Sequence, residues 1–84
     1  MSASPAVTDA ERIAAAACRV QGVTGCRFVR SRTISSGLVF AEVTITVAGD
    51  ARVADGHDIA DQVEDSVRAA LGGTADVTVH VEPS

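Results

Sequence analysis

The order of the periodic segments predicts a two-layer α+β fold, helix–strand–strand–helix–strand, in which two helices cover a three-stranded mixed sheet. Segments 8–20 and 52–71 place apolar residues at helical spacing, and segments 26–34, 38–47 and 76–82 have strand patterns. Helices must cover the apolar face of such a sheet. Because the last strand follows a helix, it is expected to pair in parallel with a neighbour through a right-handed crossover.

The first helix is predicted to begin at Thr8. The Thr8 hydroxyl and the Glu11 carboxylate have the spacing of a capping box. In a capping box, the hydroxyl accepts from the backbone N–H three residues later, and the carboxylate accepts from the backbone N–H of the first residue. Three apolar residues then recur on one face: Ile13, Ala17 and Val20. A glycine at position 22 is a common way to end a helix. Gly22 to Gly25 is therefore expected to be a connector.

The first two strands are expected to form a hairpin. In segment 26–34, Phe28 shares a face with Arg30 and Arg32, so that face is expected to meet solvent or acidic groups. Ser35 to Gly37 is typical of a tight turn, with Gly37 available for positive φ. Segment 38–47 alternates clearly between inward apolar residues and outward ones: Phe40, Glu42, Thr44 and Thr46. Such alternation predicts a half-buried strand.

The second helix is predicted over residues 52–71, with Asp50 as a plausible N-cap. Apolar residues recur at every fourth position of this helix: Ile59, Val63, Val67 and Leu71. The closing strand, 76–82, points Val77, Val79 and Val81 inward and Thr78, His80 and Glu82 outward. His80 and Glu82 are thus expected on one face, about 7 Å apart along the strand.

Length and composition limit the classes of function. The 84 residues make one domain, expected over residues 8–84 after a flexible tail at residues 1–7. The net charge of −4 and the two aromatic residues argue against nucleic acid as a partner. No apolar run is long enough for direct membrane insertion. Cys18 and Cys26 are expected to be reduced thiols of a cytoplasmic protein, with Cys18 a small buried residue.

The candidate site consists of His57, His80 and Glu82. Imidazole nitrogen and carboxylate oxygen suit zinc and other divalent first-row ions. On spacing alone, a histidine on an exposed strand face is more often a solvated or hydrogen-bonded side chain than a metal ligand. No phosphate loop, nucleophile elbow or linked catalytic set is present, so the chain is not expected to be an enzyme. The arginine cluster of positions 27, 30 and 32 is expected to pair with acids.

Three segments, in order, resemble one known family. Gly22-Val23-Thr24-Gly25 is followed by Arg30-Ser31-Arg32; His57 to Glu64 reads H-D-I-A-D-Q-V-E; and Val77 to Pro83 reads V-T-V-H-V-E-P. Over residues 8–83 they are similar to the cytoplasmic C-terminal domain of cation diffusion facilitator (cation efflux) transporters. The opening Met1-Ser2-Ala3 and the ending at Ser84 favour a free-standing protein over an excised domain.

The resemblance implies a metallochaperone-like, ferredoxin-like sandwich that forms a homodimer and binds a divalent metal, zinc first, at or near the interface. It implies His57, His80 and Glu82 as ligands. The cytoplasmic domain of a cation transporter is a further candidate partner. Many metal-binding members have His or Asp after the glycine turn, where this chain has Cys26-Arg27-Phe28. A metal-independent structural or interaction domain therefore stays open, as does a small-molecule regulatory domain.

Overall fold

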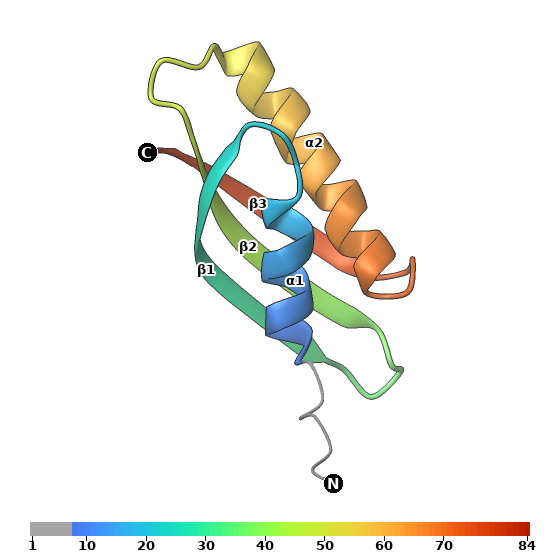
Figure 1. Ribbon diagram of the computed structural model, residues 1–84. Helices are drawn as coiled ribbons and strands as arrows, with labels where there is room; N and C mark the ends of the chain where they lie inside the picture. The colour runs from blue at the N-terminus through green and yellow to red at the C-terminus, as the bar shows by residue number, and fades with distance from the viewer. Residues whose placement is uncertain (1–7) are drawn as a thin grey trace, which may run out of the picture.

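The computed structural model describes residues 8–84, which form the predicted helix–strand–strand–helix–strand order in two layers (Figure 1). The elements, in chain order, are α1 (Asp9–Cys18), β1 (Val23–Thr33), β2 (Val39–Val47), α2 (Val53–Ala70) and β3 (Asp76–Pro83). The flexible tail expected at residues 1–7 lies outside the described part of the chain.

The sheet has the order β1-β2-β3, so β2 is its central strand. Strands β1 and β2 pair antiparallel, and Gly37 in their turn has a φ of +87°. Strand β3 pairs with β2 in parallel, after the chain has crossed the sheet through α2. The predicted hairpin and the predicted parallel pairing are both confirmed.

Both helices pack on one face of the sheet, which we call the covered face (Figure 1). Its core is aliphatic and includes Ile13, Val63 and Val67 from the helices and Ala41, Val43, Ile45, Val47 and Val77 from the sheet. The hydroxyl of Ser66 in α2 donates a hydrogen bond of 2.9 Å to the carbonyl oxygen of Ala16 in α1. This bond joins the two helices within the covering layer.

The helix starts show one correct and one wrong expectation. Thr8 caps α1, because its hydroxyl accepts a 3.1 Å hydrogen bond from the backbone N–H of Glu11. Asp50 does not cap α2, because α2 begins only at Val53 and its N-cap is Arg52, which makes no capping bond with its side chain. A turn closed by the N–H of Ala51 on the carbonyl of Ala48 holds Asp50 before the helix.

Strand β1 begins at Val23, three positions before the expected start. Its register against β2 shifts twice, between Val23 and Gly25 and again between Cys26 and Phe28. Each shift adds a residue that interrupts the period-two pattern, which hides the strand start in the sequence. Gly22 turns the chain into β1 with a φ of +98°, and a Cβ there would lie 2.6 Å from Cδ1 of Ile59.

Cys18 is exposed, so the expectation that it is buried was wrong. It is the last residue of α1, and the face that packs on the sheet carries Ile13, Ala16 and Ala17 instead. Cys26 is the partly buried cysteine and packs against the core.

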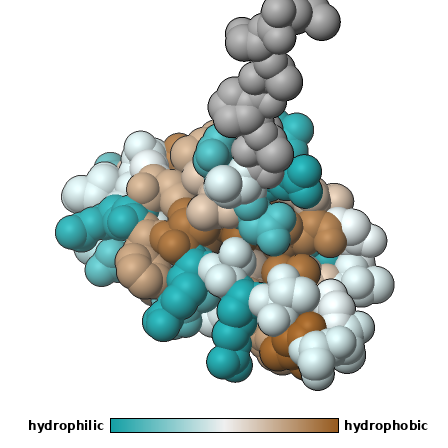
Figure 2. All heavy atoms as spheres, turned by 90° about the horizontal axis from the view of Figure 1, so that it is seen from below, coloured by the Kyte–Doolittle hydropathy of each residue, from teal (hydrophilic) through white to brown (hydrophobic). Residues whose placement is uncertain are grey.

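The surface is mixed in character. Viewed from the end at which α1 begins, hydrophobic surface lies between hydrophilic side chains (Figure 2). Among residues 8–84, four large hydrophobic side chains are exposed, namely Phe28, Ile34, Val53 and Val81. Neither helix within residues 8–84 is both long and apolar enough to cross a membrane.

Candidate metal site on the open sheet face

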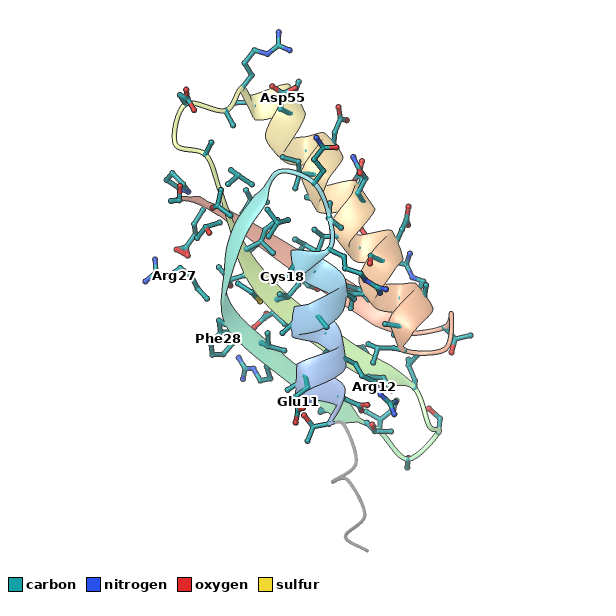
Figure 3. All side chains as sticks on the ribbon, viewed as in Figure 1. Glu11, Arg12, Cys18, Arg27, Phe28 and Asp55 are labelled. Atoms are coloured by element: carbon teal, nitrogen blue, oxygen red, sulfur yellow. The ribbon has the colours of Figure 1, made fainter. Side chains whose placement is uncertain are left out.

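The face of the sheet opposite the helices, which we call the open face, carries the charged side chains of the strands. Alternation along a strand places every second residue on the same face. The open face therefore includes Phe28, Arg30 and Arg32 of β1, Phe40, Glu42 and Thr44 of β2, and Thr78, His80 and Glu82 of β3. Figure 3 shows Arg27 and Phe28 projecting from β1, away from α1.

His80 and Glu42 meet on this face. Nε2 of His80 lies 3.3 Å from Oε2 of Glu42, and both side chains reach solvent. The parallel register pairs Glu42 with Thr78 and Thr44 with His80, so the contact is a diagonal between neighbouring strands. The hydrogen bond from His80 holds the pKa of the Glu42 carboxyl below its usual value, and the Arg30 charge acts in the same direction. The carboxylate is therefore ionised and available as an acceptor or ligand.

Glu42 is the functional candidate that sequence reasoning missed. Its outward direction on β2 follows from the alternation of that strand. What alternation cannot give is the register of β3 against β2, which brings together two residues 38 positions apart.

Glu82 lies on β3 beyond His80, opposite Thr46 in the register. Its Oε2 lies 3.6 Å from Nη1 of Arg27. Arg27, expected from the sequence to pair with an acid, therefore occupies one of the carboxylates that would attract a cation.

His57 is exposed in the first half of α2, in the layer that covers the other face of the sheet. It lines a groove of about 460 Å³ between the start of α2 and the ends of β2 and β3, together with Asp61, Val79, Val81 and Glu82. His80 is not among the residues that line this groove. Within residues 8–84, no three side chains of the metal-ligating types His, Cys, Asp and Glu come together as a possible site. The three predicted ligands therefore do not converge inside one subunit.

Cys26 is not placed to replace a missing ligand. It pairs with Ile45 and packs against the core on the covered face, away from His80. Burial raises the pKa of the Cys26 thiol, and the neighbouring Cys18 raises it further. A protonated thiol is a poor metal ligand, because the thiolate is the form that binds.

The donor set on the open face fits half of a zinc site. Two ligand atoms, each about 2.0–2.1 Å from a tetrahedral zinc, lie about 3.3 Å apart. The separation of His80 Nε2 and Glu42 Oε2 is 3.3 Å, which also suits a hydrogen bond. A closed site needs further donors, and residues 8–84 of one subunit bring no third His, Cys, Asp or Glu together with this pair.

The class that the structure defines is a small two-layer α+β domain with an open, charged sheet face. The family model of the cation efflux protein cytoplasmic domain matches residues 5–84. The chain therefore belongs to the cytoplasmic domain family of cation efflux proteins, which confirms the resemblance and the expected cytoplasmic location. No curated protein matches the chain in sequence.

Solved structures of one protein share the fold closely. The MamM CTD in a cadmium form is 29% identical, with a TM-score of 0.83, and the match covers 90% of this chain and 94% of that one. A nickel form is 26% identical with the same TM-score, covering 90% of this chain and 95% of that one. These matches confirm the metallochaperone-like fold.

Proposed function

We propose that the chain is a non-catalytic regulatory domain of a cation efflux system, which forms a homodimer and binds a divalent cation, with zinc favoured. The contact between His80 and Glu42 carries this proposal, because it sets an imidazole and an ionised carboxylate at the separation of two zinc ligands. Glu82, two residues beyond His80, supplies a second carboxylate on the same face. The MamM CTD, solved in cadmium, nickel and copper forms, supports the choice of a metal.

The proposed ligands come from two copies of the chain. His57 lies in the helical layer and cannot join His80 within one subunit, so a shared site needs His57 from a second copy. Small domains gain stability by association, and a metal bound between two copies would favour the dimer by mass action. Zinc would link the open face of one copy to the first half of α2 in the other.

Calorimetry with Zn²⁺ on wild type, His80→Ala and Glu42→Gln tests the site. We expect His80→Ala to abolish zinc binding, and Glu42→Gln to weaken it by about tenfold or more, since loss of a ligand removes most of a site's affinity. The exposed neighbour Thr78→Ala is the matched control on the same strand and face. Equal heats from wild type and His80→Ala would reject the site.

Mixing two variants tests whether the site is shared. If His80 and His57 of different copies bind one ion, neither His57→Ala nor His80→Ala binds alone. A mixed dimer of the two variants then keeps one of its two sites. Because random exchange makes half of the dimers mixed, zinc binding by an equimolar mixture returns to about a quarter of the wild-type stoichiometry. No recovery after subunit exchange would contradict the two-copy arrangement.

A second candidate function is dimerisation without metal, which the arginine pairs favour. Arg27 and Arg30 each lie within 4.0 Å of a carboxylate that a metal would use, so the open face is already partly neutralised. In this case a second copy or the cytoplasmic domain of a transporter would bind with no ion between. Molecular mass in solution, unchanged by chelator and by Zn²⁺, would favour this function over the first.

A further inference from the structure

Two arginines of β1 hold the two carboxylates of the open face. Nη1 of Arg27 lies 3.6 Å from Oε2 of Glu82, and Nη2 of Arg30 lies 3.5 Å from Oε1 of Glu42. The other oxygen of Glu42 faces His80. Each carboxylate proposed for the metal is thus already paired with a positive charge from the same subunit.

The backbone of β1 explains how Arg27 reaches its partner. Cys26 pairs with Ile45 and the next registered residue, Phe28, pairs with Thr44, so Arg27 is the extra residue of a bulge. Bulges bend a strand and redirect a side chain. Strands β1 and β3 are not neighbours, and the Arg27 side chain therefore extends across the central strand to reach Glu82.

Arg30 is oriented by a second contact. Its guanidinium carbon lies 5.6 Å from the centre of the Phe28 ring, within the range of a cation–π interaction. The Phe28 ring and the Glu42 carboxylate therefore both contact Arg30. Both arginines are about two-thirds exposed, with side-chain values of 66% for Arg27 and 68% for Arg30. Exposed ion pairs are weak, so an incoming ion can displace them.

We propose that Arg27 and Arg30 compete with the metal for Glu82 and Glu42 and thereby lower the affinity of the site. This inference rests on the proposed metal function and adds its regulation. A divalent cation displaces Arg27 from Oε2 of Glu82, and it binds Oε2 of Glu42 against the charge of Arg30 on the other oxygen. The arginines remain nearby after displacement and repel the ion, which raises the metal concentration that the domain needs before it responds.

Charge-neutral replacements of the arginines test the competition. We expect Arg27→Gln and Arg30→Gln each to tighten zinc binding by about 3- to 10-fold, and the double variant to tighten it further. The size follows from a weak exposed ion pair plus the repulsion of a doubly charged ion in water. Arg27→Lys keeps the charge and is expected to stay within about twofold of wild type. Thermal unfolding of each apo-protein checks that the fold is unchanged.

Arg12→Gln is the matched control. It removes the same charge from an exposed arginine, which pairs with Asp9 on α1 at 3.8 Å. If Arg12→Gln tightens zinc binding as much as Arg27→Gln, net charge alone explains the effect and the competition is overturned. Equal affinity of wild type and the double arginine variant also overturns it.

The outcomes separate this inference from the proposed function. Zinc binding by wild type, with no gain in the arginine variants, leaves the metal function and rejects the competition. Binding by the double variant alone supports the competition and contradicts the proposal that the wild-type domain binds zinc. No zinc binding by any of the proteins contradicts both.

Discussion

The two faces of the sheet use alternate residues of the same strands, but their side chains are held in different ways. On the covered face, Val43 and Ile45 have no exposed surface and belong to the core, to which both helices contribute side chains. On the open face, Glu42 and His80 contact each other and solvent. Burial therefore fixes the fold through one face, and leaves charges on the other face free to exchange partners.

The two edge strands add a second difference within the open face. Strand β1 brings Arg30 and Arg32, and β3 brings Asp76 and Glu82. Ion pairs run from the basic edge toward the acidic one, to Glu42 on the central strand and to Glu82 beyond it. The face is thus nearly balanced in charge, although the chain as a whole has a net charge of −4.

The largest expected effect contrasts neighbouring residues of β2. Ile45→Ala removes a fully buried side chain from the covered face and should lower the free energy of unfolding by about 2–5 kcal/mol. Thr44→Ala, one position earlier and on the open face, should change it by no more than about 0.5 kcal/mol. Urea titration followed by circular dichroism measures both. Equal losses would show that the open face is also packed, for example in a dimer.

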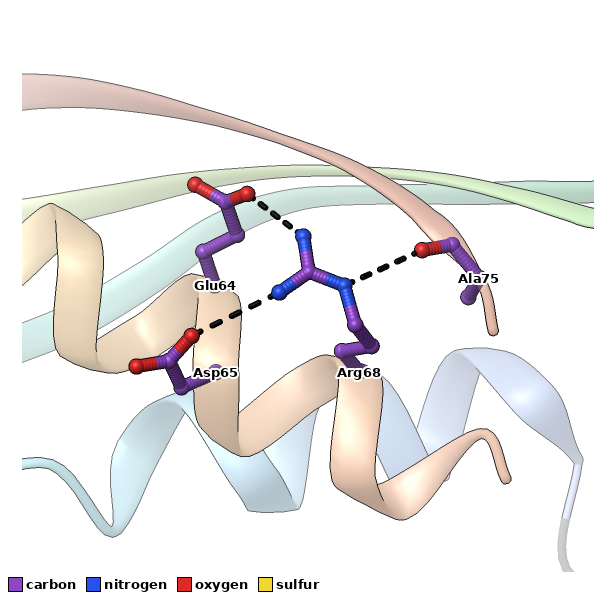
Figure 4. A network of polar contacts seen from close by, with 4 residues as sticks. All are labelled: Glu64, Asp65, Arg68 and Ala75. Carbon is purple, nitrogen blue, oxygen red and sulfur yellow. Dashed lines mark hydrogen bonds and ion pairs between the residues drawn. The ribbon is translucent and has the colours of Figure 1, made fainter. Parts of the chain in front are cut away.

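A medium effect is expected at Arg68, a charged residue that supports the covering layer. Its guanidinium contacts Glu64 and Asp65 of α2, and its Nε donates to the carbonyl oxygen of Ala75 at 3.3 Å (Figure 4). The last bond joins the end of α2 to the chain that enters β3. Arg68→Ala should lower the free energy of unfolding by about 1–2 kcal/mol, since it removes charge-assisted hydrogen bonds from a partly exposed group.

Thermal unfolding in low and high salt checks the Arg68 prediction. Arg12→Ala removes the exposed ion pair between Arg12 and Asp9 on α1. This substitution should lower the free energy of unfolding by no more than about 0.5 kcal/mol. A loss in Arg68→Ala no greater than in Arg12→Ala would mean that the bond to Ala75 contributes nothing.

The sequence predicted the fold well where one strong period runs through an element. The alternation of residues 39–47 predicted the burial of β2 except at Thr46, and Thr8 with Glu11 located the start of α1. Thr46 was expected to face outward but is buried, with its hydroxyl 2.8 Å from the hydroxyl of Thr24. The predicted start of β1 was wrong because bulges add residues that interrupt the period-two pattern of the strand. The prediction that Asp50 caps α2 was wrong because Asp50 lies in a turn, closed by the N–H of Ala51 on the carbonyl of Ala48, that precedes the helix.

The candidate site was only partly predictable for a geometric reason. Alternation indicated that His80 and Glu82 share an outward face, as they do. Their neighbours across the sheet depend on register, which the single sequence does not contain. Glu42 and the ion pair of Arg27 with Glu82 therefore emerged only from the coordinates. Whether His57 joins His80 from a second copy stays a prediction, because it depends on an interface between two chains.

The smallest effect, a change in pH dependence, is expected from Glu42→Gln on the open face. The hydrogen bond from His80 and the charge of Arg30 lower the pKa of Glu42 in the folded chain. A carboxyl whose pKa is lower when folded binds more protons when unfolded, so stability rises with pH in the window between the two values. The contribution of Glu42 is thus complete above the usual glutamate pKa of about 4.3 and is lost as the pH falls through the folded value.

Urea unfolding of wild type and Glu42→Gln between pH 3 and pH 7, at about half-unit steps, measures this window. The stability of wild type should fall more steeply than that of the variant on the acid side, and the two slopes should agree near neutral pH. Thr78→Ala, beside Glu42 in the register and without a charge, should keep the wild-type slope. If the stability of wild type and of Glu42→Gln falls equally steeply as the pH is lowered, His80 does not hold this carboxylate in solution. The open face would then carry no preformed pair of ligands for a metal.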